Sequence, residues 1–451
     1  MTSHFKTSIK NFQKSKSIEN KKKYSFNYVS LALVLAVFTS GHVLTVDALG
    51  LRLILQITMI ALILTFLFTS YKKKINKKGL IVIYVALSCV LSDLIVRQDL
   101  NDILGYALLI SLTLTILLMN PESILKFIGT LNYINCFFAS CSIIALLISI
   151  NSSSMFNAMF DKAPYYSSSF LSGIGWQSLL GHADTEQLFF GLTLPRISAH
   201  LQQASLVPAY FLLPLAISLA FISKNRSYII LLIILFSILS TGGNTYVAFA
   251  MTIFIYTFAK YIPQIFFTVM PFVLIIFSSS LLVYLFIDTY DADALKEMSR
   301  SFGESYESAS SNQTPVGQRL GSGIVRLALM GYQTIGFIEN FPLPANSALV
   351  KNTIGGNLMT NGLRGGVIGF LFTSVMYYIL FHSISQGLKQ CKPSEKKKIF
   401  GFSLMYALIF QSFIYNDFGF STYYGYTMFA IIIILSSSLK KINNIKTQPN
   451  S

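Results

Sequence analysis

The chain has 451 residues, of which 53% are hydrophobic and only 12% are charged, and its mean hydropathy is +0.60. A soluble domain of this length has no way to hide so much apolar surface, whereas a surface that faces lipid can be apolar all round. The composition therefore excludes an ordinary soluble protein. The net charge of +16 invites a nucleic-acid function, so the position of the charges has to be considered next.

Hydropathy along the chain predicts an all-α polytopic integral membrane protein with about twelve spans, in a bilayer that needs about 20 residues per helix. The predicted spans lie near residues 28–47, 49–69, 79–96, 103–120, 127–150, 205–223, 227–240, 244–259, 264–287, 365–384, 399–416 and 422–439. Two connections are long, at about 151–204 and 288–364, and both follow an outward-going span. We expect one membrane domain, 28–439, between basic tails at 1–27 and 440–451.

The charges sort by side once the N-terminus is placed inside. The inside segments then hold 24 of the 34 Lys and Arg residues but only three of the 18 Asp and Glu residues. This is the asymmetry that the positive-inside rule requires, so both termini are expected in the cytoplasm and both long loops outside. Lysine clusters such as Lys72–Lys74 and Lys396–Lys398 are interpreted as topology signals and contacts with anionic lipid, and no nucleic-acid partner is expected.

The first long loop ends in a candidate phosphate site. Pro195 suits the first turn of a helix, which would place Arg196, His200 and Gln203 at i, i+4 and i+7 on one face near the membrane surface. Arginine makes two-pronged contacts with phosphate, so this face suits a diphosphate. Anchoring to lipid headgroups is the competing interpretation.

The second long loop offers a similar pair. Residues 319–340 alternate apolar and polar residues at helical spacing, which predicts an amphipathic helix resting on the outer membrane face or a helix packed on its own bundle. Arg319 and Arg326 would share one face of it. An arginine in so apolar a segment needs a partner or water, and headgroup contact again competes with a functional site.

A third set leads into the tenth span. Asn357, Asn361 and Arg364 fall at i, i+4 and i+7, and the glycines around them permit close approach of backbones. Glycines at span ends are also common packing features. No metal-binding motif and no carboxylate or lysine at mid-bilayer depth is evident, which counts against an ion-coupled transporter.

The order of these features resembles the O-antigen polymerase and ligase superfamily, and the polymerases most closely, over most of the chain. Four motifs carry the resemblance: Arg196-Ile197-Ser198 before a span with Pro208; the turn Leu239-Ser240-Thr241-Gly242-Gly243-Asn244; Arg319 and Arg326 ahead of Pro342-Leu343; and Asn357-Leu358 followed by Gly362, Gly366 and Gly369. An arginine usual in the turn motif is missing. Gly356 stands where ligases have a histidine, which favours a polymerase.

The resemblance implies a GT-C-like fold and a metal-independent glycosyltransferase in the bacterial inner membrane, without a cofactor. It would transfer a growing glycan from undecaprenyl diphosphate onto a new lipid-linked repeat unit at the periplasmic face. The implied partners are the undecaprenyl-diphosphate-linked oligosaccharide, the lipid bilayer, a chain-length regulator and a flippase. The implied catalytic residues are Arg196, Arg319, Arg326 and His200; the implied substrate-binding residues are Gln203, Asn357, Asn361 and Arg364. The alternatives are a ligase onto lipid A-core and, in a different class, a lipid-linked oligosaccharide flippase.

Overall fold

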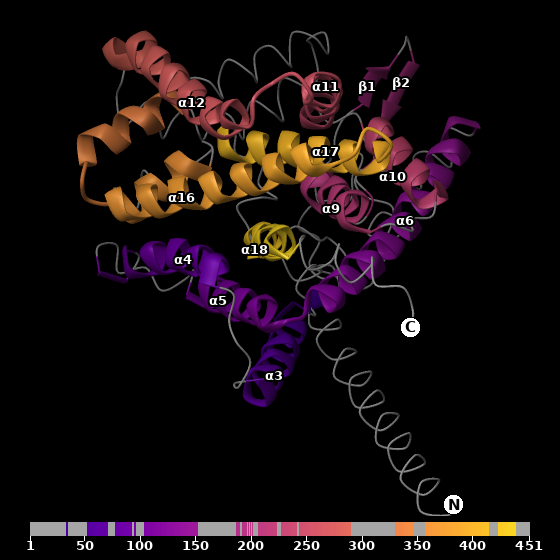
Figure 1. Ribbon diagram of the computed structural model, residues 1–451, viewed down its shortest axis with the longest axis horizontal. Coiled ribbons are helices and arrows are strands. Elements are labelled where there is room, and N and C mark those ends of the chain that lie inside the picture. Colours follow the sequence, from indigo (N-terminus) through magenta and orange to yellow (C-terminus); the bar gives the residue numbers. More distant parts are fainter. Residues whose placement is uncertain are drawn as a thin grey trace, which may run out of the picture.

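The protein is a bundle of apolar helices, seen in a computed structural model (Figure 1). The structure describes residues 33–34, 52–70, 77–92, 94–95, 103–151, 186–189, 192–195, 197, 199, 201, 206–222, 227–240, 243–289, 330–345, 357–414 and 423–438. Three of the described helices are long and apolar enough to cross a membrane, over Pro121–Ile148, Gln264–Leu285 and Leu358–Gln390. Shorter apolar helices pack among them. The architecture is that of a helical membrane protein, as the hydropathy predicted.

The helices follow the predicted spans closely. They are α3 (Arg52–Ser70), α4 (Leu80–Ser92), α5 (Ile103–Leu118), α6 (Pro121–Asn151), α9 (Leu213–Phe221), α10 (Ser227–Leu239), α11 (Gly243–Phe258), α12 (Gln264–Phe286), α16 (Asn357–Gln390), α17 (Lys396–Ile414) and α18 (Tyr423–Ser437). Short turns η1 (Lys77–Gly79), η4 (Pro208–Leu212) and η5 (Ile287–Thr289) extend α4, α9 and α12. Eleven predicted spans thus coincide with a described helix. The first, 28–47, lies almost wholly outside the described residues.

Aromatic side chains at the centre hold α12, α16, α17 and α18 together. The ring of Phe413 on α17 lies 4.7 Å from Tyr377 on α16 and 5.0 Å from Phe272 on α12. Tyr377 also meets Phe429 of α18 at 5.8 Å. Aromatic pairs at these separations add to the dispersion energy of a close-packed interior. The rings therefore place α16 and α17 side by side through the middle of the molecule (Figure 1).

Glycines let α17 approach its neighbours closely. A Cβ at Gly401 would lie 2.6 Å from the backbone nitrogen of Ala220 on α9. A Cβ at Gly387 on α16 would lie 2.4 Å from the ring of Phe402. Small residues at such crossings are the usual means by which membrane helices gain dispersion contacts.

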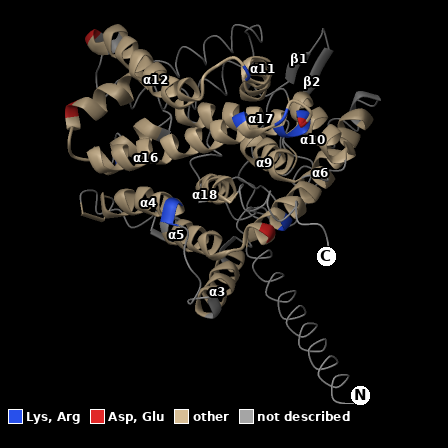
Figure 2. Cartoon of the chain, viewed as in Figure 1, with Lys and Arg blue, Asp and Glu red and all other residues tan. Residues whose placement is uncertain are grey.

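Lysine side chains gather where α16 ends and α17 begins. Lys389, in the last turn of α16, donates from Nζ to the Ala259 carbonyl at 2.6 Å, so a cation meets the carbonyl end of α11. Figure 2 shows basic residues near the start of α17, and also beside α4 and at the start of α6, while acidic colour marks the far end of α12. The acidic residue that follows α12 is Asp288.

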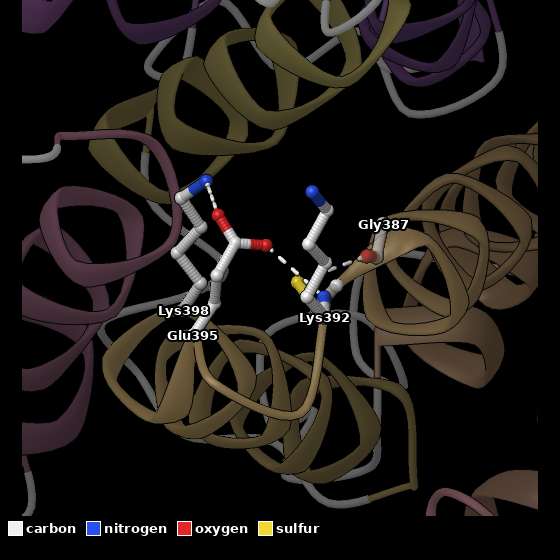
Figure 3. A network of polar contacts seen from close by, with 5 residues as sticks. Gly387, Lys392, Glu395 and Lys398 are labelled. Atoms are coloured by element: carbon white, nitrogen blue, oxygen red, sulfur yellow. Dashed lines mark hydrogen bonds and ion pairs between the residues drawn. The ribbon is translucent and has the colours of Figure 1, made fainter.

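A polar network closes the turn between α16 and α17 at this end (Figure 3). The Glu395 carboxylate is paired with Lys398 and accepts the Lys392 backbone N–H at 3.1 Å. The Cys391 thiol donates to the Gly387 carbonyl at 3.3 Å. Burial, with a contribution from Glu395, raises the pKa of Cys391 to about 11, so the thiol is neutral at physiological pH.

One element departs from the prediction in the first long loop. Strands β1 (Glu186–Phe189) and β2 (Leu192–Pro195) pair antiparallel, with Phe189 opposite Leu192. The helix expected to start at Pro195 is therefore wrong, because Pro195 ends a strand and Ala199 has a φ of 54°. The side chains of Ile197, Ala199 and Leu201 are fully buried. Burial of these apolar side chains stabilises the segment, and the prediction of a helix from Pro195 did not take this burial into account.

Candidate functional site

Helix α16 is broken at Gly366. This residue has φ 61° and ψ −153°, so nine helical residues from Asn357 to Gly365 precede the break and Val367 starts the long remainder. A Cβ at Gly366 would lie 2.6 Å from the Pro342 carbonyl oxygen. Both the backbone angles and the contact require glycine at this position.

A turn of the chain fills the break. In an unbroken helix the Val367 N–H would donate to the Leu363 carbonyl. Here it donates to the Pro342 carbonyl at 3.0 Å, and the Leu363 carbonyl accepts the Ala345 N–H at 2.8 Å. One lost helical bond is replaced by two bonds to residues 342–345. Irregular backbone among membrane helices is stable only with such replacement partners.

The helix before this turn packs against the bundle. Residues 330–340 are helical and residues 331–337 are buried. Phe337 stacks on Phe370 of α16 at 5.2 Å, and a Cβ at Gly362 would lie 3.0 Å from its ring. For the described part of the predicted amphipathic helix, the packed alternative is therefore the one observed.

Asn361 bridges the two sides of the break. Its Nδ2 donates to Thr373 Oγ1 at 3.1 Å, on the long part of α16, and to the Tyr426 hydroxyl of α18 at 2.7 Å. Its Oδ1 accepts from the Cys89 thiol of α4 at 3.8 Å. All four side chains are buried, and two of the contacts join helices far apart in the sequence.

Glycines on α16 bring α4 to this cluster. A Cβ at Gly365 would lie 3.1 Å from Ser88 Oγ, and one at Gly369 would lie 2.3 Å from the Asn361 carbonyl oxygen. The predicted close approach of backbones around these glycines is thus confirmed. Its effect is to seat α4 and the short helical segment of α16 against the same side chains.

Arg364 lies beside the break, three residues after Asn361. Its side chain is half-buried, and it interacts electrostatically with the Tyr426 hydroxyl. A guanidinium is always charged and is costly to place among apolar helices without polar neighbours. The break, with its shifted backbone groups and the Tyr426 hydroxyl, supplies a polar setting for it.

An exposed apolar stripe starts on the long part of α16, just beyond the break at Gly366. Ile368, Leu371, Val375 and Tyr378 of α16 are all exposed, at the spacing of one helix face. Exposed apolar side chains of α4 continue the surface, and Tyr84 of α4 meets Phe372 of α16 at 5.6 Å. A cation close in the chain to such an exposed apolar surface suits an amphiphile with an anionic head and a long tail.

A second aromatic contact lies on the other side of α18. Tyr424 stacks on Tyr210 of η4 with ring centres 4.5 Å apart. The carbonyl of Tyr210 accepts Asn135 Nδ2 at 2.7 Å, where the helical donor would be Pro214, which has no N–H. Tyr424 and Tyr426 therefore tie the first turn of α18 to η4 on one side and to the break in α16 on the other.

The remaining predicted site residues are not placed by the structure. Arg196, His200, Gln203, Arg319 and Arg326 lie outside the described residues, and only the backbone of Asn357 is described, at the start of α16. The three positions of the third set do share one helical segment, as predicted. The cluster around Asn361 was missed, because no sequence pattern links it to partners 12 and 65 residues away.

Comparison with known proteins identifies no relative: no family model, no curated protein and no solved structure matches this chain. Among the described residues, no group of three or more His, Cys, Asp or Glu side chains is arranged to hold a metal ion.

Proposed function

We propose that this protein is a polysaccharide polymerase of the bacterial inner membrane, which transfers a growing glycan from undecaprenyl diphosphate onto a lipid-linked repeat unit. The observation that carries the proposal is the position of Arg364. It lies half-buried two residues before the break in α16, four residues before the first member of the exposed apolar stripe, and at the opposite end of α16 from the lysine-rich turn.

The reaction needs charge stabilisation at one place. The acceptor hydroxyl attacks the anomeric carbon of the donor, a new glycosidic bond forms, and the bond from that carbon to the diphosphate breaks. The diphosphate leaves with the bonding electrons, and the hydroxyl proton passes to a base. Arg364 is suited to bind the leaving diphosphate, since a guanidinium offers two parallel donors to phosphate oxygens. Arg196, Arg319 and Arg326 are proposed to share this task, and His200 is proposed as the base.

The apolar stripe offers a surface on which the polyprenyl tail of the lipid carrier can bind. A polyprenyl tail is as apolar as the bilayer, so it can lie along Ile368, Leu371 and Val375 while its diphosphate approaches Arg364 from the side. This geometry requires no water-filled passage through the bundle. Gln203 and Asn357 are proposed to contact the sugars or phosphates near the same end.

The proposal includes twelve spans in a GT-C-like fold, cytoplasmic termini, and two long loops in the periplasm. The described turns with Lys389 and Lys396–Lys398 then face the cytoplasm, where positive charge is expected. Fusion reporters inserted near residues 170 and 310 are expected to report an external location. A cytoplasmic signal at either insertion would contradict this topology.

One observation favours a second function. Broken membrane helices are typical of transporters, so the break in α16 also fits a flippase for lipid-linked oligosaccharides. The carboxylates whose side chains the structure describes, Glu122, Asp288, Glu339 and Glu395, lie at helix ends or in turns rather than inside the bundle, which supports the polymerase instead.

Deleting the gene and restoring it with variants separates these functions. Loss of a polymerase leaves lipid A-core capped with a single repeat unit, and the wild-type gene restores a ladder of chain lengths. Arg364→Ala is expected to leave single units, while the matched removal of a cation at the opposite end, Lys397→Ala, restores the ladder. Bare core in the deletion strain would indicate a ligase, and a normal ladder with Arg364→Ala would remove the central role of this arginine.

A further inference from the structure

Asn361 was expected to bind substrate, but its hydrogen bonds describe a different task. A side-chain amide has two N–H donors and one carbonyl oxygen. Both donors are used, toward Thr373 and Tyr426, and the oxygen accepts from Cys89. The side chain is 5% exposed. A substrate would have to break these contacts to reach it.

The short segment of α16 depends on such contacts for its position. It has nine helical residues, and helices of this length do not persist alone in the absence of tertiary partners. The turn at residues 342–345 holds its end at Leu363. Asn361 holds it from the other direction, against α18 and the long part of α16.

Arg364 lies on the same short segment of α16 as Asn361, and it shares Tyr426 as a partner. It lies three residues after Asn361, so the two side chains are neighbours on the helix surface. The Tyr426 hydroxyl accepts the Asn361 amide and interacts electrostatically with the Arg364 guanidinium. A change at Asn361 therefore reaches Arg364 both through the backbone of one helical turn and through one hydroxyl group.

We propose that Asn361 is a positioning residue, which fixes Arg364 for a lipid diphosphate by tying the short segment of α16 to Thr373 and Tyr426. This inference rests on the proposed function for the identity of the substrate. It predicts that the partners of Asn361 act on substrate affinity only through Arg364.

The test uses substitutions that remove one acceptor each. Tyr426→Phe removes the hydroxyl that accepts from Asn361, and Thr373→Val removes the other acceptor at nearly constant volume. Matched controls lie elsewhere in the bundle: Tyr406→Phe removes a buried hydroxyl that donates to the Phe267 carbonyl, and Thr252→Val removes one that donates to the Ala248 carbonyl.

Two quantities are measured on the full-length protein in lipid nanodiscs. The first is the Kd for undecaprenyl diphosphate, by native mass spectrometry; the second is the KM for the lipid-linked repeat unit during polymer formation. Tyr426→Phe and Thr373→Val are expected to raise both about five- to tenfold, the effect of one lost hydrogen bond, with melting temperatures near those of the controls. Asn361→Gln is expected to retain more affinity than Asn361→Leu.

The decisive comparison is in an Arg364→Ala background. There Tyr426→Phe is expected to change the Kd less than twofold, because the group that it positions is gone. Equal losses in both backgrounds, or losses matched by Tyr406→Phe, would show a general structural role and overturn the inference. Wild-type protein that binds undecaprenyl diphosphate but forms no polymer would refute the polymerase. The Kd values in the two backgrounds would then still test the role of Asn361. Wild-type protein that does not bind it would overturn both.

Discussion

Replacing Gly366 with alanine tests the break in α16, on which the site depends. Alanine at φ 61° and ψ −153° is strained by about 1–3 kcal/mol. Its Cβ would also lie 2.6 to 3.0 Å from backbone atoms of residues 342–344, and these atoms cannot rotate aside as the end of a side chain can. Displacing that turn gives up the bonds of Val367 and Ala345, each with a net value of about 1 kcal/mol. The expected total destabilisation is about 3–5 kcal/mol.

The assay is thermal unfolding of the purified protein in detergent, followed by size-exclusion chromatography after heating. The matched control is Gly129→Ala on α6, where a Cβ meets no atom within 4 Å and helix propensity favours alanine. Gly366→Ala is expected to melt several degrees below wild type, roughly a degree or more per kcal/mol in a chain of this size, and Gly129→Ala at or above it. Equal melting of the two variants would refute the broken geometry, since a continuous α16 tolerates alanine at both positions.

Two further substitutions and one chemical modification test other parts of the fold. Asn135→Leu is expected to lower stability by about 1–3 kcal/mol, because the Tyr210 carbonyl loses its donor; unchanged thermal unfolding would contradict that bond. Gly401→Ala is expected to cost about 1–3 kcal/mol by forcing α17 away from Ala220, and the same unfolding assay would show no loss if the crossing were looser. With Cys391 as the sole cysteine, iodoacetamide at pH 8 is expected to react at least about tenfold more slowly than with free cysteine, and faster as the pH approaches 11 and thiolate forms. A rate equal to that of free cysteine would show that the thiol is not buried as described.

Hydropathy was sufficient to locate the described helices, because a lipid-facing helix must be apolar over most of its length. It placed the start of the tenth span at residue 365, whereas α16 begins at Asn357. The difference arises because the first nine residues of α16 carry Asn361 and Arg364, whose polarity is balanced by tertiary contacts. Hydropathy averages over such residues and counts them as loop.

The features missed by sequence reasoning depend on contacts between distant segments. The hairpin ending at Pro195 had a local signal, a glycine between two short apolar runs, but the proline was interpreted as a helix start. The break at Gly366 had only a weaker local signal, which is the run of glycines around it. Nothing in the sequence indicates that residues 342–345 enter that break, because the pairing is set by the tertiary packing of Phe337 on Phe370.

The central claim is most directly tested by reconstitution of the purified protein in liposomes with an undecaprenyl-diphosphate-linked repeat unit as the only added substrate. We predict polymers of several repeat units, release of undecaprenyl diphosphate in proportion to each bond formed, and loss of both with Arg364→Ala but not with Lys397→Ala. Liposomes in which wild-type protein leaves the repeat unit unpolymerised, or moves it across the bilayer without joining units, would contradict the account.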